Sequence, residues 1–319
     1  MEVIVFGSNK VGGVKIITSS LYTSLKEIGY KTKYIYGFKV IKYFFKNFLS
    51  IYFGRNNKIY FITWSLYNFI PFPRKRVLCF MHGFPSANQQ DIFRYILFRI
   101  NIIISKIRGI TTISVSSYTQ SILKDIYKIN TKIIKNSIPY NTFIETKYEE
   151  LEKDIDIIFV GRANDHKLPI YILKNLDILA NKGFSIYVFG EGASKNKFLK
   201  SHNNSKIRFS KFISNKLIIK FLKRSKYFIS CSSSEPFGIV FLEALLSGCK
   251  IISPRSGGLL EISSYFKNKH SNYFNFFDNE IYVHELLGSL DYNFNTVSSS
   301  EMKSIIDILK YHFDPKKHA

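Results

Sequence analysis

Short runs of consecutive apolar residues alternate along the chain with longer stretches whose apolar positions recur at helical spacing. Runs such as Glu2–Gly7, Val77–Met81 and Ile155–Val160 are predicted to be strands covered on both faces, because such strands are apolar at nearly every position. Strands that alternate with helices in this way are typical of βαβ units and parallel sheets. The pattern therefore predicts an α/β protein.

The remaining elements fall into two series. The first series is predicted to add strands at 33–36, 58–63 and 111–115 and helices near 91–107 and 118–127, the last one capped by Ser117. The second series is predicted to add strands at 185–189, 206–209, 227–230 and 250–253 and helices at 168–181, 215–224 and 239–246.

A polar segment at 147–153 separates the two series. We therefore expect two Rossmann-like, doubly wound domains, at residues 1–150 and 151–295, that face a central cleft at the carboxyl ends of their strands. The last segment, 296–319, is expected to form a helix that crosses back to the first domain.

The charge balance is strongly basic, with 46 Lys and Arg against 23 Asp and Glu and a formal net charge of +23. Such a charge favours phosphorylated substrates, polyanions or anionic membrane surfaces. No RNA- or DNA-binding motif accompanies the lysines, so a nucleic-acid partner is not expected.

The cysteines and the N-terminal residues predict a cytoplasmic protein. Cys79, Cys231 and Cys249 lie in apolar runs without metal-ligand spacing, so we expect reduced core cysteines in a cytoplasmic protein. The chain opens on an apolar strand without the basic segment and cleavage site of a signal peptide. No uncharged apolar run reaches the roughly 18 residues of a transmembrane helix.

Glu235 and Glu243 are the first candidates for chemistry. Every residue from 239 to 246 except Glu243 is apolar, and a helix that is apolar all round is buried. A buried carboxylate without a partner is costly, so Glu243 is expected to accept a hydrogen bond. Glu235 precedes the helix start, where free amide groups favour anions. This segment alone does not decide whether the two glutamates bind a ligand or have a purely structural role.

Basic and glycine-rich positions follow two predicted strands. Arg162 and Lys167 come directly after Ile155–Val160, and two cations near a helix start suit a diphosphate, although a solvated basic loop is the alternative. Gly12 and Gly13 follow the first strand and would let the backbone approach a ligand, or would simply form a tight turn.

Three further motifs differ in what they indicate. His82 ends a strand and would face the expected cleft, although a lone histidine is more often structural. Gly257-Gly258 opens another helix that favours an anion. Asp154 and Asp156 have the Asp-x-Asp spacing of metal-dependent sugar transferases, but they precede a strand. We therefore expect them at the amino end, away from the cleft, and expect no metal site.

Together these motifs resemble the retaining GT-B glycosyltransferases, the large family of bacterial mannosyl-, glucosyl-, galactosyl- and N-acetylglucosaminyltransferases with a Glu-x7-Glu motif. The segment 234–261 carries the resemblance most fully, with Ser-Glu-Pro-Phe-Gly, Leu-Glu-Ala and Gly-Gly. Val-Gly-Arg at 160–162 and Gly-Glu-Gly at 190–192 support it. Leu168 and Pro236 stand where the family more often has glycine.

The resemblance implies a nucleoside-diphosphate sugar as donor substrate, no cofactor and no metal. Arg162 and Lys167 would neutralise the diphosphate, Glu235 would hold the donor sugar and Glu243 the ribose. His82, in the acceptor-binding first domain, would touch the transferred sugar. The other donor-binding residues that it implies are Gly12, Gly13, Gly190, Phe212, Phe237, Gly238 and Ile239.

The leading hypothesis is a retaining hexosyltransferase with a glycan or lipid-linked acceptor in the synthesis of bacterial surface polysaccharide, such as O-antigen, capsule or glycolipid. A nucleotide-sugar epimerase on the same fold and a catalytically silent partner subunit are the alternatives. Lysines interleaved with aromatic residues at 38–53 predict docking on the anionic inner face of the cell membrane. A helix that packs its aromatic face on the sheet is the alternative for that run.

Overall fold

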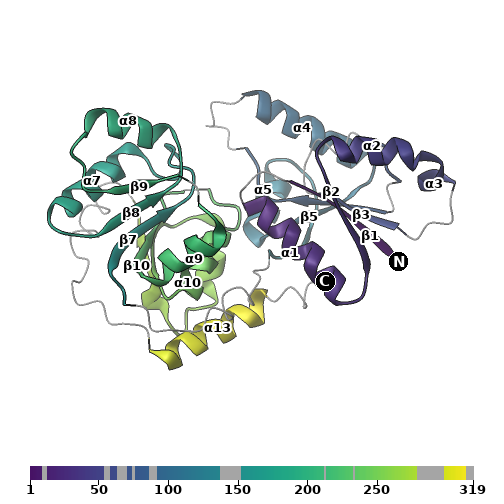
Figure 1. Ribbon diagram of the computed structural model, residues 1–319. Helices are drawn as coiled ribbons and strands as arrows, with labels where there is room; N and C mark the ends of the chain where they lie inside the picture. Colours follow the sequence, from purple (N-terminus) through teal and green to yellow (C-terminus); the bar gives the residue numbers. More distant parts are fainter. Residues whose placement is uncertain are drawn as a thin grey trace. The chain divides into compact units, whose positions relative to one another are not determined.

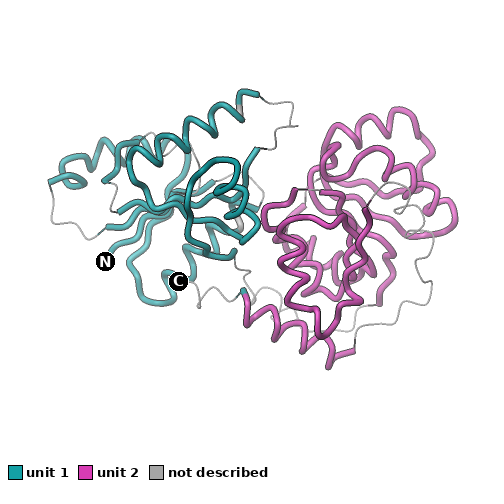
Figure 2. The backbone as a smooth tube through the Cα atoms, turned by 180° about the vertical axis from the view of Figure 1, so that it is seen from behind, with its two compact units in different colours: residues 1–138, 313–319 teal, residues 139–312 magenta. Residues whose placement is uncertain are grey.

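The computed structural model describes residues 1–8, 13–53, 58–62, 70–73, 76–85, 92–136, 152–211, 213–232, 234–278 and 298–313. The chain forms two compact units, residues 1–138 with 313–319 and residues 139–312 (Figure 2). The expected domain borders at residues 150 and 295 lie outside the described residues. Among those residues, no helix has the length and apolarity that crossing a bilayer requires.

Unit 1 is built on six parallel strands in the order β2-β1-β3-β4-β5-β6. Residue Glu2 lies opposite both Lys31 and Lys58, so the three strands on this side of the sheet begin at the same level. The strands are β1 (Glu2–Gly7), β2 (Lys31–Tyr36), β3 (Lys58–Ile62), β4 (Val77–Met81), β5 (Thr111–Ser114) and β6 (Lys132–Ile133).

Helices cover both faces of this sheet (Figure 1). Val3 and Val5 of β1 pack with α1, whereas Ile4 and Phe6 pack in a larger cluster with residues of the other helices. Because successive side chains of a strand point to opposite faces, α1 lies on one face and α2 to α5 on the other. The helices are α1 (Gly13–Glu27), α2 (Phe38–Lys46), α3 (Phe48–Tyr52), α4 (Ile92–Ile107) and α5 (Ser117–Asp125).

Unit 2 has a second sheet of six parallel strands, in the order β12-β11-β10-β7-β8-β9. Its strands are β7 (Ile155–Val160), β8 (Ile186–Phe189), β9 (Arg208–Ser210), β10 (Ser225–Ile229), β11 (Lys250–Pro254) and β12 (Phe274–Phe277). The chain runs outward from β7 through β8 to β9 and then returns to β10 on the other side of β7. The order therefore reverses between β7 and β10, and ligands bind at such a point in doubly wound sheets.

The helices of unit 2 enclose a core of almost fully buried side chains from the sheet and the helices that flank it. The helices are α7 (Ile170–Asn181), α8 (Ala193–Ser201), α9 (Asn215–Lys223), α10 (Ile239–Leu246), α11 (Gly257–Ser264), the short 3-10 helix η3 (Ser271–Tyr273) and α13 (Ser299–Phe313). Helix α10 is buried at every position except Val240, as a sequence that is apolar at every position but Glu243 predicts. The expected arrangement of two parallel-sheet α/β domains is confirmed.

Local differences from the expected elements are small and have identifiable causes. The cap of α5 is Ser116 and not Ser117, because the Ser116 side chain accepts a hydrogen bond from the Thr119 amide. The Ser214 side chain caps α9 by accepting a hydrogen bond from the Leu217 amide. The pattern did not predict β6, α8 or β12. Strands β6 and β12 offer too few positions to show a period, and most residues of α8 (Ala193–Ser201) are polar, so it shows no apolar period.

Lys153, just before β7, fixes the amino end of the unit 2 sheet. Its amine donates hydrogen bonds to the carbonyl of Ser225 at 2.7 Å, of Ser247 at 2.9 Å and of Gly248 at 3.2 Å. These carbonyls belong to the start of β10 and to the turn that ends α10, where backbone acceptors lack helical partners. Burial lowers the pKa of this amine.

We predict that Lys153→Met destabilises unit 2 by about 2 kcal/mol or more, because three buried carbonyls lose a charged donor. Urea denaturation followed by circular dichroism measures the effect. Lys197→Met on the exposed side of α8 is the matched control. Equal midpoints for the two variants would show that Lys153 does not hold these carbonyls in solution.

Candidate active site

The loops that follow β7 and β10 meet where the strand order of unit 2 reverses. Lys167, in the first loop, places its amine 2.8 Å from the Glu235 carboxylate in the second. The Lys167 side chain is 34% exposed and the Glu235 side chain 17%, so both charges remain accessible to a ligand. Two residues that are 68 positions apart in the sequence are thus brought together at one end of the sheet.

Backbone hydrogen bonds hold Lys167 in this position. Its amide donates to both the carbonyl and the side-chain oxygen of Asn164, at 3.0 and 3.2 Å. Its carbonyl accepts from the Cys231 amide, just past β10, at 2.9 Å. The lysine is therefore fixed by both neighbouring loops, and only its side chain is left to adapt.

Arg162 follows the same strand and is exposed. Within the described part of the chain, its guanidinium has no hydrogen bond or ion pair. The preceding Gly161 donates its amide to the Phe189 carbonyl at the end of β8. A free guanidinium thus stands on the loop that also carries Lys167, and a guanidinium suits bidentate phosphate binding.

Two helices begin against the Glu235 segment. Gly238 precedes α10 with a φ of 84°, and a Cβ there would lie 2.3 Å from Phe241. Gly258, in the first turn of α11, donates its amide to the Glu235 carbonyl, and a Cβ there would lie 2.5 Å from the Phe237 Cα atom. Gly258 lets the start of α11 approach the backbone of the Glu235 segment, and Gly238 leaves room for the Phe241 ring. Two helix starts therefore lie beside Glu235.

The loop after β8 packs against the loop after β7. Gly190 donates its amide to Ser210 of β9 at 3.0 Å. A Cβ on Gly192 would lie only 2.1 Å from the Ala163 carbonyl oxygen, so only glycine fits there. Lys195, 6% exposed, donates to the Gly190 carbonyl at 3.2 Å and pairs with Glu191 at 3.0 Å. Sequence reasoning did not single out Lys195, because a lysine on a helix usually points to solvent.

Glu243 lies one turn inside α10 and is 5% exposed. Burial raises the pKa of its carboxyl to about 7, and a hydrogen bond from Asn215 of α9 acts in the opposite direction. The expected hydrogen-bond partner therefore exists within the protein. Asn215 was not predicted, because nothing in the sequence shows that α9 packs on α10.

The remaining predicted residues lie elsewhere. His82 follows β4 of unit 1 and stacks on Phe80 at 6.0 Å. Burial lowers the pKa of His82 to about 4, so the ring is neutral near pH 7. Gly13 starts α1 of unit 1 and has open space around it. Gly12 and Phe212 lie outside the described residues.

The Asp-x-Asp pair sits at the amino end of β7, as expected. Asp154 forms an ion pair with Arg224, with an Nε–Oδ1 distance of 2.7 Å. Asp156 pairs with Lys226 at 2.7 Å and also accepts from the Ser185 amide at 2.8 Å. Both carboxylates thus stabilise the start of the sheet. In the described ranges no three His, Cys, Asp or Glu side chains gather around a common point.

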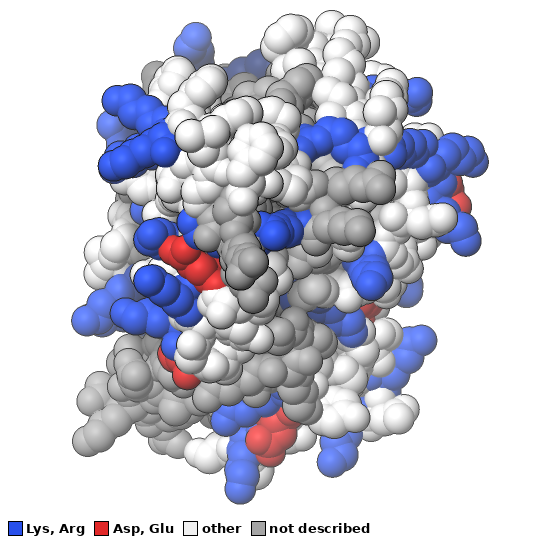
Figure 3. All heavy atoms as spheres, turned by 90° about the vertical axis from the view of Figure 1, so that its right-hand side faces the viewer, with Lys and Arg blue, Asp and Glu red and all other residues white. Residues whose placement is uncertain are grey.

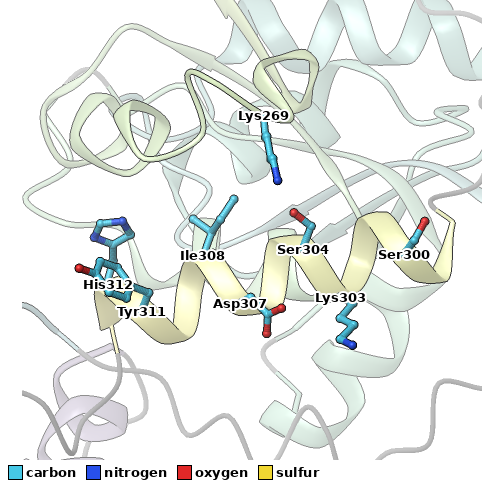
Figure 4. Close-up of a pocket in the computed structure, with 8 residues that line it drawn as sticks. All are labelled: Lys269, Ser300, Lys303, Ser304, Asp307, Ile308, Tyr311 and His312. Atoms are coloured by element: carbon cyan, nitrogen blue, oxygen red, sulfur yellow. The ribbon is translucent and has the colours of Figure 1, made fainter.

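A pocket of about 490 Å³ lies along α13 (Figure 4). Lys269 reaches toward the helix from the opposite wall, and the other lining residues come from α13. None of the predicted site residues lines this pocket. The candidate site is therefore the cluster where the strand order reverses.

The comparisons with known proteins agree with this architecture. Solved structures that match include sucrose-phosphate synthase from Thermosynechococcus elongatus, with 12% identity, a TM-score of 0.69 and coverage of 97% of this chain and 94% of that one. The Anabaena protein HepE, in complex with UDP and glucose, matches with 13% identity, a TM-score of 0.68 and coverage of 99% and 96%. WaaG, a glycosyltransferase involved in lipopolysaccharide biosynthesis, matches with 11% identity, a TM-score of 0.66 and coverage of 99% and 98%.

The two parallel-sheet domains and these matches define a protein with the GT-B glycosyltransferase fold. The family model described as "Glycosyl transferases group 1" matches residues 141–271. The chain therefore carries a group 1 glycosyltransferase domain, and that domain includes Arg162, Lys167, Glu235 and Glu243. A comparison with curated proteins gives no match.

Glu243 makes stability depend on pH. Its pKa is about 7 in the folded protein against an ordinary value of 4.5, so the folded state holds the proton more tightly. Its contribution is fully present below about pH 4.5 and is lost as the pH rises through 7. The shift corresponds to a free energy on the order of 3 kcal/mol.

We predict that Glu243→Gln raises the melting temperature at pH 8 relative to the unmodified protein and changes it little at pH 5. The reason is that the amide has no charge to bury. Thermal denaturation at both pH values measures this, with the exposed Glu152→Gln as the control. A uniform shift at both pH values would contradict a buried titrating carboxyl.

Proposed function

We propose that this protein transfers a hexosyl group from a nucleoside-diphosphate sugar to a glycan or lipid-linked acceptor, with retention of the anomeric configuration. The observation that carries this proposal is the cluster of Arg162, Lys167 and Glu235 at the reversal of strand order, within the segment that matches the group 1 family. We further propose that the product belongs to a bacterial surface polysaccharide or glycolipid.

The cluster suits the departure of a diphosphate. When the bond from the sugar C1 atom to the phosphate oxygen breaks, negative charge develops on the diphosphate. Arg162 and Lys167 would stabilise that charge as preorganised cations, and the starts of α10 and α11 would add amide donors. The acceptor hydroxyl would bond to C1 on the same face and pass its proton to the departing phosphate oxygen.

The carboxylates would orient the donor. Glu235, already paired with Lys167 at 2.8 Å, would accept hydrogen bonds from the hydroxyls of the donor sugar, and its pairing would hold the Lys167 amine toward the phosphates. Glu243 would bind the ribose, with Asn215 fixing its carboxyl. His82 would meet the transferred sugar as a neutral hydrogen-bonding group, since its pKa is about 4.

We predict that Lys167→Ala weakens binding of a nucleoside diphosphate by roughly 10- to 100-fold, the loss expected for one charge-assisted hydrogen bond, and abolishes turnover. Thermal shift and calorimetry with UDP, GDP and their sugars measure binding. UDP is tried first because the HepE structure contains it. Lys226→Ala is the matched control, because that lysine also pairs with a carboxylate but at the amino end of the sheet. Unchanged nucleotide affinity in Lys167→Ala would refute the phosphate site.

Glu235→Gln separates the two functions of the cluster. The variant keeps Lys167 and should bind the bare nucleotide at least as well as the unmodified protein, but it should bind the nucleotide sugar more weakly. If it loses affinity for both ligands to the same extent, Glu235 does not contact the sugar.

We also propose that transfer needs no divalent metal, since Arg162 and Lys167 would supply positive charge at the diphosphate and the Asp154 and Asp156 carboxylates are engaged in ion pairs. Activity should persist in excess EDTA. Loss of turnover in EDTA that Mn²⁺ or Mg²⁺ restores would contradict the proposal.

A further inference from the structure

Helices α2 and α3 of unit 1 use one face to pack on the sheet and leave another uncovered. Val40 and Phe44 are buried in the core of the unit. Large apolar side chains on the outer side of the same helices and just after them are between 72% and 82% exposed, namely Phe38, Phe45, Leu49 and Phe53. The segment 38–53 therefore has one side that packs on the sheet and another side that is available to a membrane.

Helix α4 exposes a second apolar stripe, which the sequence pattern did not single out. Phe98 and Ile102 face the core. On the other side, five side chains spaced alternately three and four residues apart are between 40% and 78% exposed, namely Phe93, Ile96, Ile100, Ile103 and Ile107. This spacing forms a continuous line along a helix. An uncovered line of this length marks an interaction surface.

The two stripes belong to the same side of unit 1. The inner faces of α2, α3 and α4 all contribute to one hydrophobic cluster, on the face of the sheet opposite α1, and Figure 1 shows the three helices on that side. Their outer faces therefore form an apolar layer on unit 1. We name this layer the α2–α4 surface.

The charge of the surrounding sequence indicates what covers the α2–α4 surface. Residues 28–124 contain 15 Lys and Arg and a single acidic residue, Asp91. Figure 3 shows one face of the molecule, on which Lys and Arg are widespread and acidic side chains are few. A second copy of the chain would bring these like charges together, whereas an anionic lipid surface complements them and accepts apolar side chains.

We propose that the α2–α4 surface inserts into the interface of anionic membranes, with Lys39, Lys42 and Lys46 of α2 on the lipid headgroups and the α4 stripe among the acyl chains. Such insertion would hold unit 1 at the membrane, where a lipid-linked acceptor is found. The inference rests on unit 1 alone and does not depend on the donor site in unit 2.

Co-sedimentation of the full chain with vesicles tests the proposal. The protein should pellet with phosphatidylglycerol vesicles at low salt and much less with phosphatidylcholine vesicles. Raising the salt to about 1 M should weaken the binding, because screening shortens the reach of the lysines to about 3 Å. No binding to phosphatidylglycerol at low salt would overturn the proposal.

Two variants separate attraction from insertion. Changing Lys39, Lys42 and Lys46 to Gln should lower the partition coefficient on the order of 100-fold. Changing Ile96 and Ile103 to Asn should lower it at least about tenfold, because both side chains would no longer enter the apolar layer. If the second variant binds vesicles as tightly as the unmodified protein, α4 does not insert.

Matched controls in the same unit carry the same chemical changes. One control changes Lys26, Lys31 and Lys132 to Gln, and the other changes Ile28 and Ile126 to Asn. These side chains are exposed and lie outside the α2–α4 surface, so both control variants should bind vesicles normally.

Sedimentation velocity without lipid shows whether a second copy of the chain covers the α2–α4 surface. A dimer that Ile96→Asn with Ile103→Asn dissociates would overturn the membrane proposal. The thermal shift with nucleotide checks each variant's fold and reports separately on the donor site.

Discussion

The hydrogen bond from the Cys231 amide to the Lys167 carbonyl joins the two loops on which the candidate site depends. The loops follow β7 and β10, which are adjacent in the sheet but lie far apart in the sequence. Once the backbones are joined, the Lys167 amine and the Glu235 carboxylate meet at 2.8 Å, and a cation and an anion stand together where the strand order reverses. A doubly wound sheet provides this position in general, and the side chains of the loops decide its chemistry.

Close backbone contacts shape the rest of the site. Gly192 and Gly258 stand where a Cβ would lie 2.1 and 2.5 Å from a backbone atom of a neighbouring segment, so any other residue would push these segments apart. As a result, the loops after β7 and β8 pack together, and α10 and α11 both begin beside Glu235. Helix starts carry unpaired amide groups and a partial positive charge. The site thus combines cationic side chains with the backbone amide groups of two helix starts.

The two units differ in how they treat apolar surface. In unit 2, α10 is buried on nearly all sides and holds Glu243 at 5% exposure, where burial raises its pKa. In unit 1, α2, α3 and α4 leave large apolar side chains in contact with solvent in a region almost without acidic residues. The first arrangement disfavours the charged form of a carboxyl group, while the second leaves apolar side chains whose removal from water would be favourable.

The sequence by itself determined the two series of parallel strands, the buried helix at 239–246 and the identity of the charged residues after β7 and β10, because these depend on local periodicity and on which residues end a strand. It did not determine that Lys167 pairs with Glu235, that Asn215 is the partner of Glu243, or that Lys195 is buried, since each requires two distant segments to pack in one particular way. The stripe on α4 shows the same limit. Its sequence is apolar on more than one side, and only the packing of Phe98 and Ile102 on the sheet decided which side stays exposed.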